Sequence, residues 1–257
     1  PVPVTMHDGR VDTSRFILDE CGFCLQECPR TLSSDEFYDQ ATVVDLYYPH
    51  MADVLRRMIG ATLVLPFSHT VRNAVRKSRE SALETEARTQ RLTGPAPLVH
   101  NDHWPESGYD LAVNKLADAE GQEAVDQATS GRFAVLNTWQ PLALVECDPI
   151  ALADWHSLAD DEEYGPGGCW HRPGHCWFYF SAMTPDELLV FKQYDSDVST
   201  ARCAIHAAFS DPSADPSSPP RQSIDVRCLA FFGNLPPRFG EAFVAAQREE
   251  AGLAERT

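Results

Sequence analysis

The sequence has few basic residues and no long apolar run. Lys and Arg together number 21 against 38 Asp and Glu, so the formal net charge is -17. A surface this acidic repels nucleic-acid phosphates and anionic lipid headgroups, which argues against either as the partner. No apolar stretch approaches the roughly 18 residues needed to cross a bilayer. The first residues also lack the layout of a signal peptide, in which a basic segment precedes an apolar one. We therefore expect a soluble, cytoplasmic protein whose partner is a small molecule.

A second closely spaced cysteine pair is also absent. Cys21, Cys24 and Cys28 form a C-x-x-C-x-x-x-C run, a spacing that can hold zinc or an iron–sulfur cluster. Either site needs a fourth ligand, and the other five cysteines are scattered along the chain. Reduced, mostly structural thiols are the favoured interpretation, and an iron–sulfur protein remains an alternative.

The chain of 257 residues is long enough for one well-buried core, and no internal repeat divides it. We expect a single domain over residues 1–257. Its first part, about 1–60, is predicted to be helical, because residues 33–60 begin with serines and acids and end with Arg-Arg and Gly. Pro49 is expected to split this segment in two. A strand over 61–67 follows, and the charged stretch at about 71–94 is either a lid or a plain surface excursion.

The second half is rich in short strands separated by Pro, Gly, Asp and Ser. This pattern is typical of an antiparallel sandwich or barrel and predicts a β-core over about 98–232. A C-terminal helix is expected at about 240–253. The predicted strands are 132–139, 176–180, 188–195, 201–209 and 223–232. The fold class is therefore mainly β with flanking helices.

Two histidines and an aspartate are the candidate metal ligands. His100 and Asp102 lie two residues apart after an apolar pair, and in a strand such residues point to the same face. His206 lies among apolar neighbours in a predicted strand, where an unpaired imidazole is costly to bury. Two imidazoles and one carboxylate on one face leave three open positions on an iron ion.

An R-x-S pair, Arg221 and Ser223, opens the last long strand. A guanidinium matches a carboxylate with two hydrogen bonds, and the serine two residues on faces the same way. The set could serve iron together with a keto acid. Two alternatives stay open: a zinc hydrolase with a metal-bound water, and a non-catalytic cupin-like binding protein.

The same segments carry a family resemblance. The chain resembles the Fe(II)/2-oxoglutarate-dependent hydroxylases and desaturases of secondary metabolism, including gibberellin desaturase-like, aspergillic-acid-type and cephem methoxylase-like proteins. The matching stretches include VHNDHWPESG, GRFAVLNTWQPL, HCWFYFSAMTPDELLVFKQYDSD and IHAAFSDPSADPSSPPRQSIDVRCLAFF. The last is the most specific, since a histidine, F-x-D-P, a Pro-rich turn and R-x-S-I-D-V-R follow in that order. The resemblance implies a double-stranded β-helix, a form of jelly roll.

The resemblance also implies the roles of individual residues. His100, Asp102 and His206 would bind Fe(II), and Arg221 with Ser223 would hold the distal carboxylate of the co-substrate 2-oxoglutarate. Arg227 is a rival for that carboxylate. Further, weaker candidates for pocket contacts are Tyr179 and Asn137. His69, His103 and Trp104 are either substrate contacts or, more in keeping with their surroundings, structural residues.

The implied activity is that of a dioxygenase that consumes O₂ and 2-oxoglutarate. Such an enzyme hydroxylates, desaturates or oxidatively cyclises a small secondary-metabolite or amino-acid-derived substrate. The choice among these outcomes depends on the placement of the substrate, which the sequence does not determine.

Overall fold

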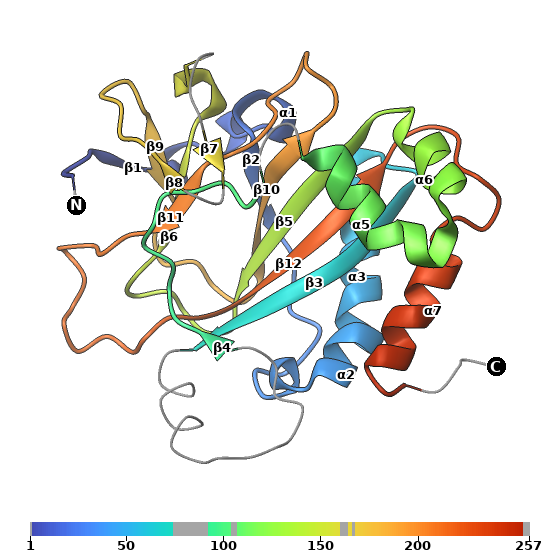
Figure 1. Cartoon of the computed structure of the whole chain (residues 1–257). Coiled ribbons are helices and arrows are strands. Elements are labelled where there is room, and N and C mark those ends of the chain that lie inside the picture. Colours follow the sequence, from blue (N-terminus) through green and yellow to red (C-terminus); the bar gives the residue numbers. More distant parts are fainter. Residues whose placement is uncertain (1, 74–91, 104–106, 160–163, 166–167, 254–257) are drawn as a thin grey trace.

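The fold is built on a large and a small β-sheet (Figure 1). It is seen in a computed structural model that describes residues 2–73, 92–103, 107–159, 164–165 and 168–253. The large sheet has the order β2, β10, β5, β12, β3, β4. Its strands are β2 (Phe23–Glu27), β3 (Leu63–Asn73), β4 (Leu92–Thr93), β5 (Phe133–Pro141), β10 (Glu187–Asp195) and β12 (Gln222–Phe231). All neighbouring pairs are antiparallel except β3 and β4.

The small sheet has the order β1, β9, β6, β11. Its strands are β1 (Met6–Asp8), β6 (Ile150–Ala153), β9 (Trp177–Tyr179) and β11 (His206–Ala208). The chain from Ala96 to His100 continues it, because it pairs with β11. A short hairpin contacts that segment, because the Cys169 N–H donates a hydrogen bond to the Val99 carbonyl. The strands of the hairpin are β7 (Tyr164–Gly165) and β8 (Gly168–Cys169). Two mainly antiparallel sheets that pack together make the jelly roll that the sequence predicts.

The central strands of the large sheet are buried on both faces, and their side chains alternate between them. On one face, Leu136 of β5 and Val226 of β12 pack with Met51 and Leu55 of a helix. On the other face, Trp139 and Phe191 pack with residues of the small sheet such as Phe178. Polar residues of β5 and β12 on this second face therefore lie between the two sheets, where a buried polar group needs a partner.

The helices divide between the two faces of the large sheet. The first face is covered by α2 (Gln40–Thr42), a π-helical turn (Val43–Tyr47) and α3 (Tyr48–Ile59), with Pro49 in the first turn of α3. The end of the second face is covered by α5 (Gly108–Glu120), α6 (Gln122–Thr129) and the start of α7 (Glu241–Glu250). Another short helix, α1 (Leu18–Cys21), precedes β2, and single 3₁₀ turns lie at Gly9–Val11, Thr13–Arg15, Glu36–Tyr38 and Trp155–Ser157. No helix of the described residues is long and apolar enough to cross a membrane.

Several predicted boundaries differ from the structure. The first 60 residues are not only helical, since β1 and β2 lie there and each joins a sheet. The β-core therefore begins well before residue 98, and β3 extends to Asn73, into the segment considered as a lid. The rest of that segment up to residue 91 lies outside the described residues. Within the predicted β-core, residues 108–129 form α5 and α6, because their apolar residues recur at helical spacing and pack on Phe133 and Phe231.

The three N-terminal cysteines do not face one common point. Cys21 packs between the two sheets, whereas Cys24 and Cys28 pack on the α3 side of the large sheet. Burial raises the pKa of Cys21 to about 11 and that of Cys24 to about 12, which keeps both thiols protonated at neutral pH. These positions suit the structural interpretation of the thiols.

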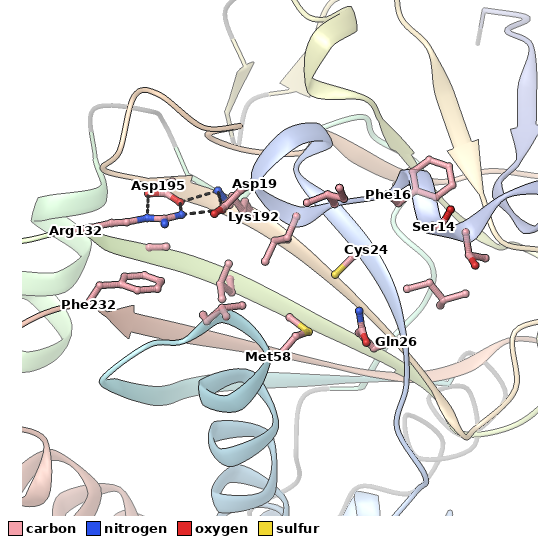
Figure 2. Close-up of a pocket in the computed structure, with 17 residues that line it drawn as sticks. Ser14, Phe16, Asp19, Cys24, Gln26, Met58, Arg132, Lys192, Asp195 and Phe232 are labelled. Atoms are coloured by element: carbon pink, nitrogen blue, oxygen red, sulfur yellow. Dashed lines mark hydrogen bonds and ion pairs between the residues drawn. The ribbon is translucent and has the colours of Figure 1, made fainter.

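A buried ion cluster lies at one end of a groove on the α3 side of the large sheet (Figure 2). The Lys192 ammonium, almost fully buried, lies 2.7 Å from Asp195 and 2.6 Å from Asp19. Arg132 reaches the same two carboxylates at 2.7 Å each. The Lys192 ammonium also donates to the Ala201 carbonyl at 2.8 Å. Each charge in the cluster is therefore compensated by another, as buried ions require.

We expect Asp195→Asn to destabilise the fold by about 3 kcal/mol, because it leaves the buried Lys192 with only the half-exposed Asp19. Lys192→Met should cost less, since Arg132 still neutralises Asp195 and a methionine fills the space. Urea unfolding followed by circular dichroism gives both values. Equal losses in the two variants would contradict this account of the cluster.

Candidate functional site

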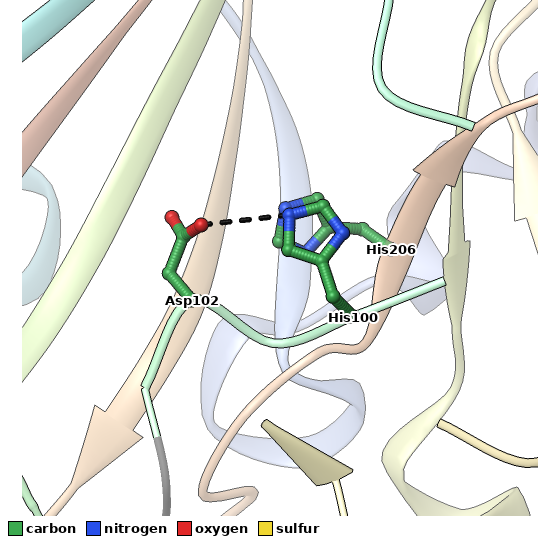
Figure 3. A group of neighbouring side chains, drawn as sticks. All are labelled: His100, Asp102 and His206. Atoms are coloured by element: carbon green, nitrogen blue, oxygen red, sulfur yellow. Dashed lines mark ion pairs between the residues drawn. The ribbon is translucent and has the colours of Figure 1, made fainter. Parts of the chain in front are cut away.

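A backbone bridge brings the two histidines together. The His100 N–H donates to the His206 carbonyl at 3.1 Å, and the His206 N–H donates to the His100 carbonyl at 2.9 Å. Their rings consequently lie with centroids 4.5 Å apart. The chain then leaves the strand and bends, so that the carboxylate oxygen Oδ1 of Asp102 comes within 3.5 Å of His100 Nε2 (Figure 3). Asp102 thus reaches the site from a bend and not from the strand geometry that the sequence suggested.

The three side chains form a group that could hold a metal ion. One ligand atom from each lies within 4.8 Å of the others. His100 Nδ1 lies 2.7 Å from the Leu98 carbonyl, and His206 Nδ1 lies 3.1 Å from the Ala204 carbonyl. A carbonyl only accepts hydrogen bonds, so Nδ1 of each ring carries the proton and Nε2 keeps its lone pair. Both imidazoles are therefore in the tautomer that binds a metal through Nε2.

Burial and neighbouring charges set the protonation of the triad. Burial lowers the pKa of His206 to about 3, so this ring is neutral at pH 7. For His100, burial lowers the pKa, but the nearby Asp102 carboxylate and the hydrogen bond to the Leu98 carbonyl outweigh it and raise the pKa. Burial opposes the charge of Asp102, yet contacts with His100 and Arg227 hold the pKa of that carboxyl far below its usual range. Asp102 is consequently an anion throughout the physiological range.

Two residues that the sequence interpretation missed fasten the bend to β10. The buried Asn101 amide donates to the Gln193 carbonyl at 2.8 Å and to the His103 carbonyl at 2.6 Å. The Gln193 side-chain oxygen accepts the Asp102 N–H at 2.9 Å. The sequence offered one signal, because Asn101 stands between the two candidate ligands. These bonds fix the direction in which Asp102 points.

The triad lines a narrow cavity of about 30 Å³ between the two sheets. Its walls combine apolar and charged side chains, and three of them are arginines. The lining comprises Arg72, Ala96, His100, Asp102, Asn137, Trp139, Ile150, Phe191, His206, Ala207, Ala208, Arg221, Asp225 and Arg227. In a chain with only 21 basic residues and a net charge of -17, this concentration of cations indicates a site for an anion.

Arg221 is the buried cation of this cavity that has no carboxylate partner in the described part of the chain. Its Nη1 donates to the Asp148 carbonyl, and its guanidinium lies 5.3 Å from the centre of the Trp139 ring. Its Nε has no hydrogen-bond partner among the described residues, and neither has the Ser223 hydroxyl two residues on. Burial lowers the pKa of Arg221 to about 10, which still leaves it charged at pH 7. Arg221 and Ser223 together suit the carboxylate of a ligand.

Arg227, the rival to Arg221, is engaged differently. Its Nε donates to Asp102 Oδ2 at 2.8 Å, and its Nη1 lies 3.5 Å from Asp225. Asn137, which faces Arg227 across the β5–β12 pair, donates to the same Asp102 oxygen at 3.1 Å. Arg72, which the sequence interpretation missed, lies 3.0 Å from Asp225 and donates to the Gly94 carbonyl. Of the three arginines, Arg227 is thus the one paired with a triad carboxylate.

Buried polar atoms without a hydrogen-bond partner gather at this site. Nine such side-chain atoms occur in the described part of the chain, and all but Trp177 Nε1 belong to residues at or next to the site. The eight are on Asn101, His103, Asn137, Trp139, Gln193, Arg221, Ser223 and Asp225. Since buried polar groups are normally paired, their concentration here indicates a region built to receive polar ligands.

Other candidates from the sequence lie elsewhere. Tyr179 is on β9, where its ring packs on Phe209 at 5.3 Å, and it does not line the cavity. His69 faces the α3 side of the sheet and contacts the Tyr48 hydroxyl at 2.8 Å, and burial lowers its pKa to about 4. It is a structural residue there. His103 follows the bend and is half-buried, and Trp104 lies outside the described residues.

The donor set fits Fe(II) with a bidentate keto acid. Two neutral imidazole nitrogens and one carboxylate oxygen on one side are the ligands that non-haem iron enzymes use, with positions left open opposite them. Arg221 offers a buried positive charge to a carboxylate of such a ligand. A hydrolytic zinc site would give no function to Arg221, whose Nε lacks a partner in the described part of the chain.

Comparison with known proteins agrees with this chemistry. A family model described as "Oxidoreductase/YMDC permease-like domain" matches residues 1–231. The hydroxylase/desaturase efuI of Hormonema carpetanum is 31% identical over 256 residues, which cover 90% of this chain and 83% of the relative. The Fe(II)/2-oxoglutarate-dependent dioxygenase nvfI of Aspergillus novofumigatus is 30% identical over 250 residues, covering 91% and 84%. A solved structure of the iron and alpha-ketoglutarate-dependent endoperoxidase NvfI superposes with a TM-score of 0.74 at 28% identity, over 90% of this chain and 86% of that one.

We expect Asn101→Ala to weaken the binding of a divalent metal by about 10-fold, because the bend that carries Asp102 loses both anchors of its amide. Anaerobic titration with Co(II), followed by its visible absorption, measures this. The matched control is Asn114→Ala on the exposed side of α5. Unchanged Co(II) affinity in Asn101→Ala would show that the bend is held by other contacts.

Proposed function

The chain belongs to the family of Fe(II)/2-oxoglutarate-dependent hydroxylases and desaturases, and we propose that it uses His100, Asp102 and His206 to bind iron and Arg221 to anchor 2-oxoglutarate. Its class is that of an oxidoreductase that consumes O₂ and 2-oxoglutarate. The observation that carries the proposal is the triad, with both Nε2 atoms directed at a common point, on the wall of a cavity that also holds Arg221, whose Nε has no partner among the described residues.

The three proposed metal ligands have different roles. His100 and His206 supply neutral nitrogens, since each Nδ1 proton is fixed on a backbone carbonyl. Asp102 supplies one negative charge, which offsets half of the charge of a divalent ion. When bound, Fe(II) with 2-oxoglutarate and O₂ supplies the oxidising power that removes hydrogen from an unactivated carbon.

The cavity walls position the organic ligands. The Arg221 guanidinium, stacked over Trp139, and the Ser223 hydroxyl are proposed to hold the far carboxylate of 2-oxoglutarate. Phe191, whose ring centre lies 4.7 Å from that of His206, covers the metal site from the apolar side and excludes water. The protein thereby fixes the reacting groups, and the oxidation itself belongs to the cofactor.

The proposed substrate is a small organic molecule. Hydroxylation, desaturation and oxidative ring closure all begin with loss of hydrogen from one carbon, so one site can serve each. The printed names of the relatives include a hydroxylase/desaturase and an endoperoxidase. A secondary-metabolite or amino-acid-derived scaffold is the substrate class that we propose.

Anaerobic addition of Fe(II) and then 2-oxoglutarate should produce the weak visible metal-to-ligand charge-transfer band of the chelate. His206→Ala should lose the band and the rise in melting temperature that Fe(II) gives the wild type, because one of three ligands is gone. A control with His156→Ala, an exposed histidine far from the triad in sequence, should keep both. Absence of the band in the wild type would refute the proposed function.

Arg221→Met should raise the dissociation constant for 2-oxoglutarate by about 30-fold or more, since a buried charge partner of the ligand carboxylate is lost. The loss should be specific to that carboxylate. 2-Oxobutyrate, which lacks it, should therefore bind wild type and variant about equally when the same band is followed. A uniform loss for both keto acids would remove Arg221 from this role.

A further inference from the structure

Asp102 has two carboxylate oxygens, and the protein treats them differently. Oδ2 accepts hydrogen bonds from Arg227 Nε at 2.8 Å and from Asn137 Nδ2 at 3.1 Å. Oδ1 faces His100 Nε2 at 3.5 Å, in the direction of the other ligands. One oxygen is therefore occupied by protein donors, and one is directed at the metal site.

We propose that Arg227 and Asn137 are positioning residues that restrict Asp102 to a single metal bond through Oδ1. The inference rests on the iron site proposed above and reassigns both residues from contacts with 2-oxoglutarate to contacts with a metal ligand. A carboxylate with both oxygens free can chelate a metal and take two positions. Here the second oxygen is held by a cation and an amide, so that only one position is taken and three remain open.

The surroundings of Arg227 make it suited to this task. It lies on β12 opposite Asn137 of β5, so both donors come from adjacent central strands of the large sheet. Asp225, on the same strand face, lies 3.5 Å from Arg227 Nη1 and limits the rotation of the guanidinium. The Asp102 N–H is held by Gln193, which limits the rotation of the carboxylate from its backbone side. The rigid sheet thus fixes the carboxylate more tightly than a bend alone could.

This geometry distinguishes Arg227 from Arg221. Arg221 has an Nε without a partner and no carboxylate within ion-pair distance among the described residues, whereas Arg227 is already paired with Asp102. A guanidinium that left Asp102 to hold 2-oxoglutarate would release Oδ2 inside the site. The two arginines of the R-x-S-I-D-V-R strand consequently act on different ligands of the same metal.

The test compares Arg227→Met with the wild type in anaerobic Fe(II) titrations, using 2-oxoglutarate and 2-oxobutyrate as separate probes. We expect Fe(II) affinity to fall by about 10- to 100-fold. At saturating Fe(II), the charge-transfer band should weaken for both keto acids to the same degree, because a chelating Asp102 competes with either of them. The wild-type preference for 2-oxoglutarate over 2-oxobutyrate should remain.

Companion variants separate positioning from folding. Asn137→Leu, of similar volume, should lower Fe(II) affinity by about 2- to 10-fold, since it removes one uncharged donor. Arg227→Lys should restore part of the affinity lost in Arg227→Met, because a charge returns near Oδ2. Arg10→Met removes a half-buried arginine from another carboxylate, Glu187, and should leave Fe(II) affinity and the band unchanged.

Two results would overturn the inference while leaving the proposed function intact. One is wild-type Fe(II) affinity together with a wild-type band in both Arg227→Met and Asn137→Leu. The other is loss of the preference for 2-oxoglutarate in Arg227→Met, which would make Arg227 the carboxylate anchor. If the wild type itself gives no charge-transfer band, the proposed function fails. That outcome differs from the two results above, in which the wild type keeps its band.

Discussion

The antiparallel bridge between His100 and His206 is the contact on which the site depends. Two backbone hydrogen bonds join the segment before the H-x-D bend to β11, and they place two imidazoles from distant parts of the chain side by side. The same pairing sets the direction of each ring. In each case the Nδ1 proton is donated to the carbonyl two residues earlier in the chain, Leu98 for His100 and Ala204 for His206. Asp102 completes the triad only because Asn101 and Gln193 tie the bend to β10. The candidate metal site thus depends on how the small sheet packs against the large one.

The large sheet carries a buried group of charged residues on each face. The two groups differ in whether their charged side chains have protein partners. On the α3 side, Lys192 and Arg132 are matched by Asp19 and Asp195, and the Lys192 ammonium also donates to a carbonyl. In such a closed set the buried charges neutralise one another. On the other face, the Arg221 Nε has no hydrogen-bond partner among the described residues. The neighbouring Ser223 hydroxyl also has none there. An open set of this kind is expected where a charged ligand binds.

Much of the site was predictable from local sequence. His100, Asp102 and His206 were identified from residue type and spacing, and the structure brings their ligand atoms within 4.8 Å. The jelly-roll core was predicted from short strands separated by turn residues. Predictions for single polar residues were less successful: Tyr179 packs on Phe209 away from the cavity, and Arg72, Asn101 and Gln193 were missed. Strand alternation gives the face on which a side chain lies, but not the neighbour that it meets across the sheet.

By itself, the sequence determined the set of donor groups. The chemistry of an imidazole, a carboxylate or a guanidinium depends on the residue type and not on the arrangement of the backbone. It also determined the alternation that puts Ser223, Asp225 and Arg227 on one face of a strand. Only the tertiary structure shows how the surroundings of the two arginines differ. Arg221 directly precedes β12 and Arg227 lies on it six residues later, and their difference comes from the groups that each contacts: a tryptophan ring and a carbonyl for Arg221, and the carboxylate of Asp102 for Arg227. Those partners arrive through pairings between remote segments, which no local pattern encodes.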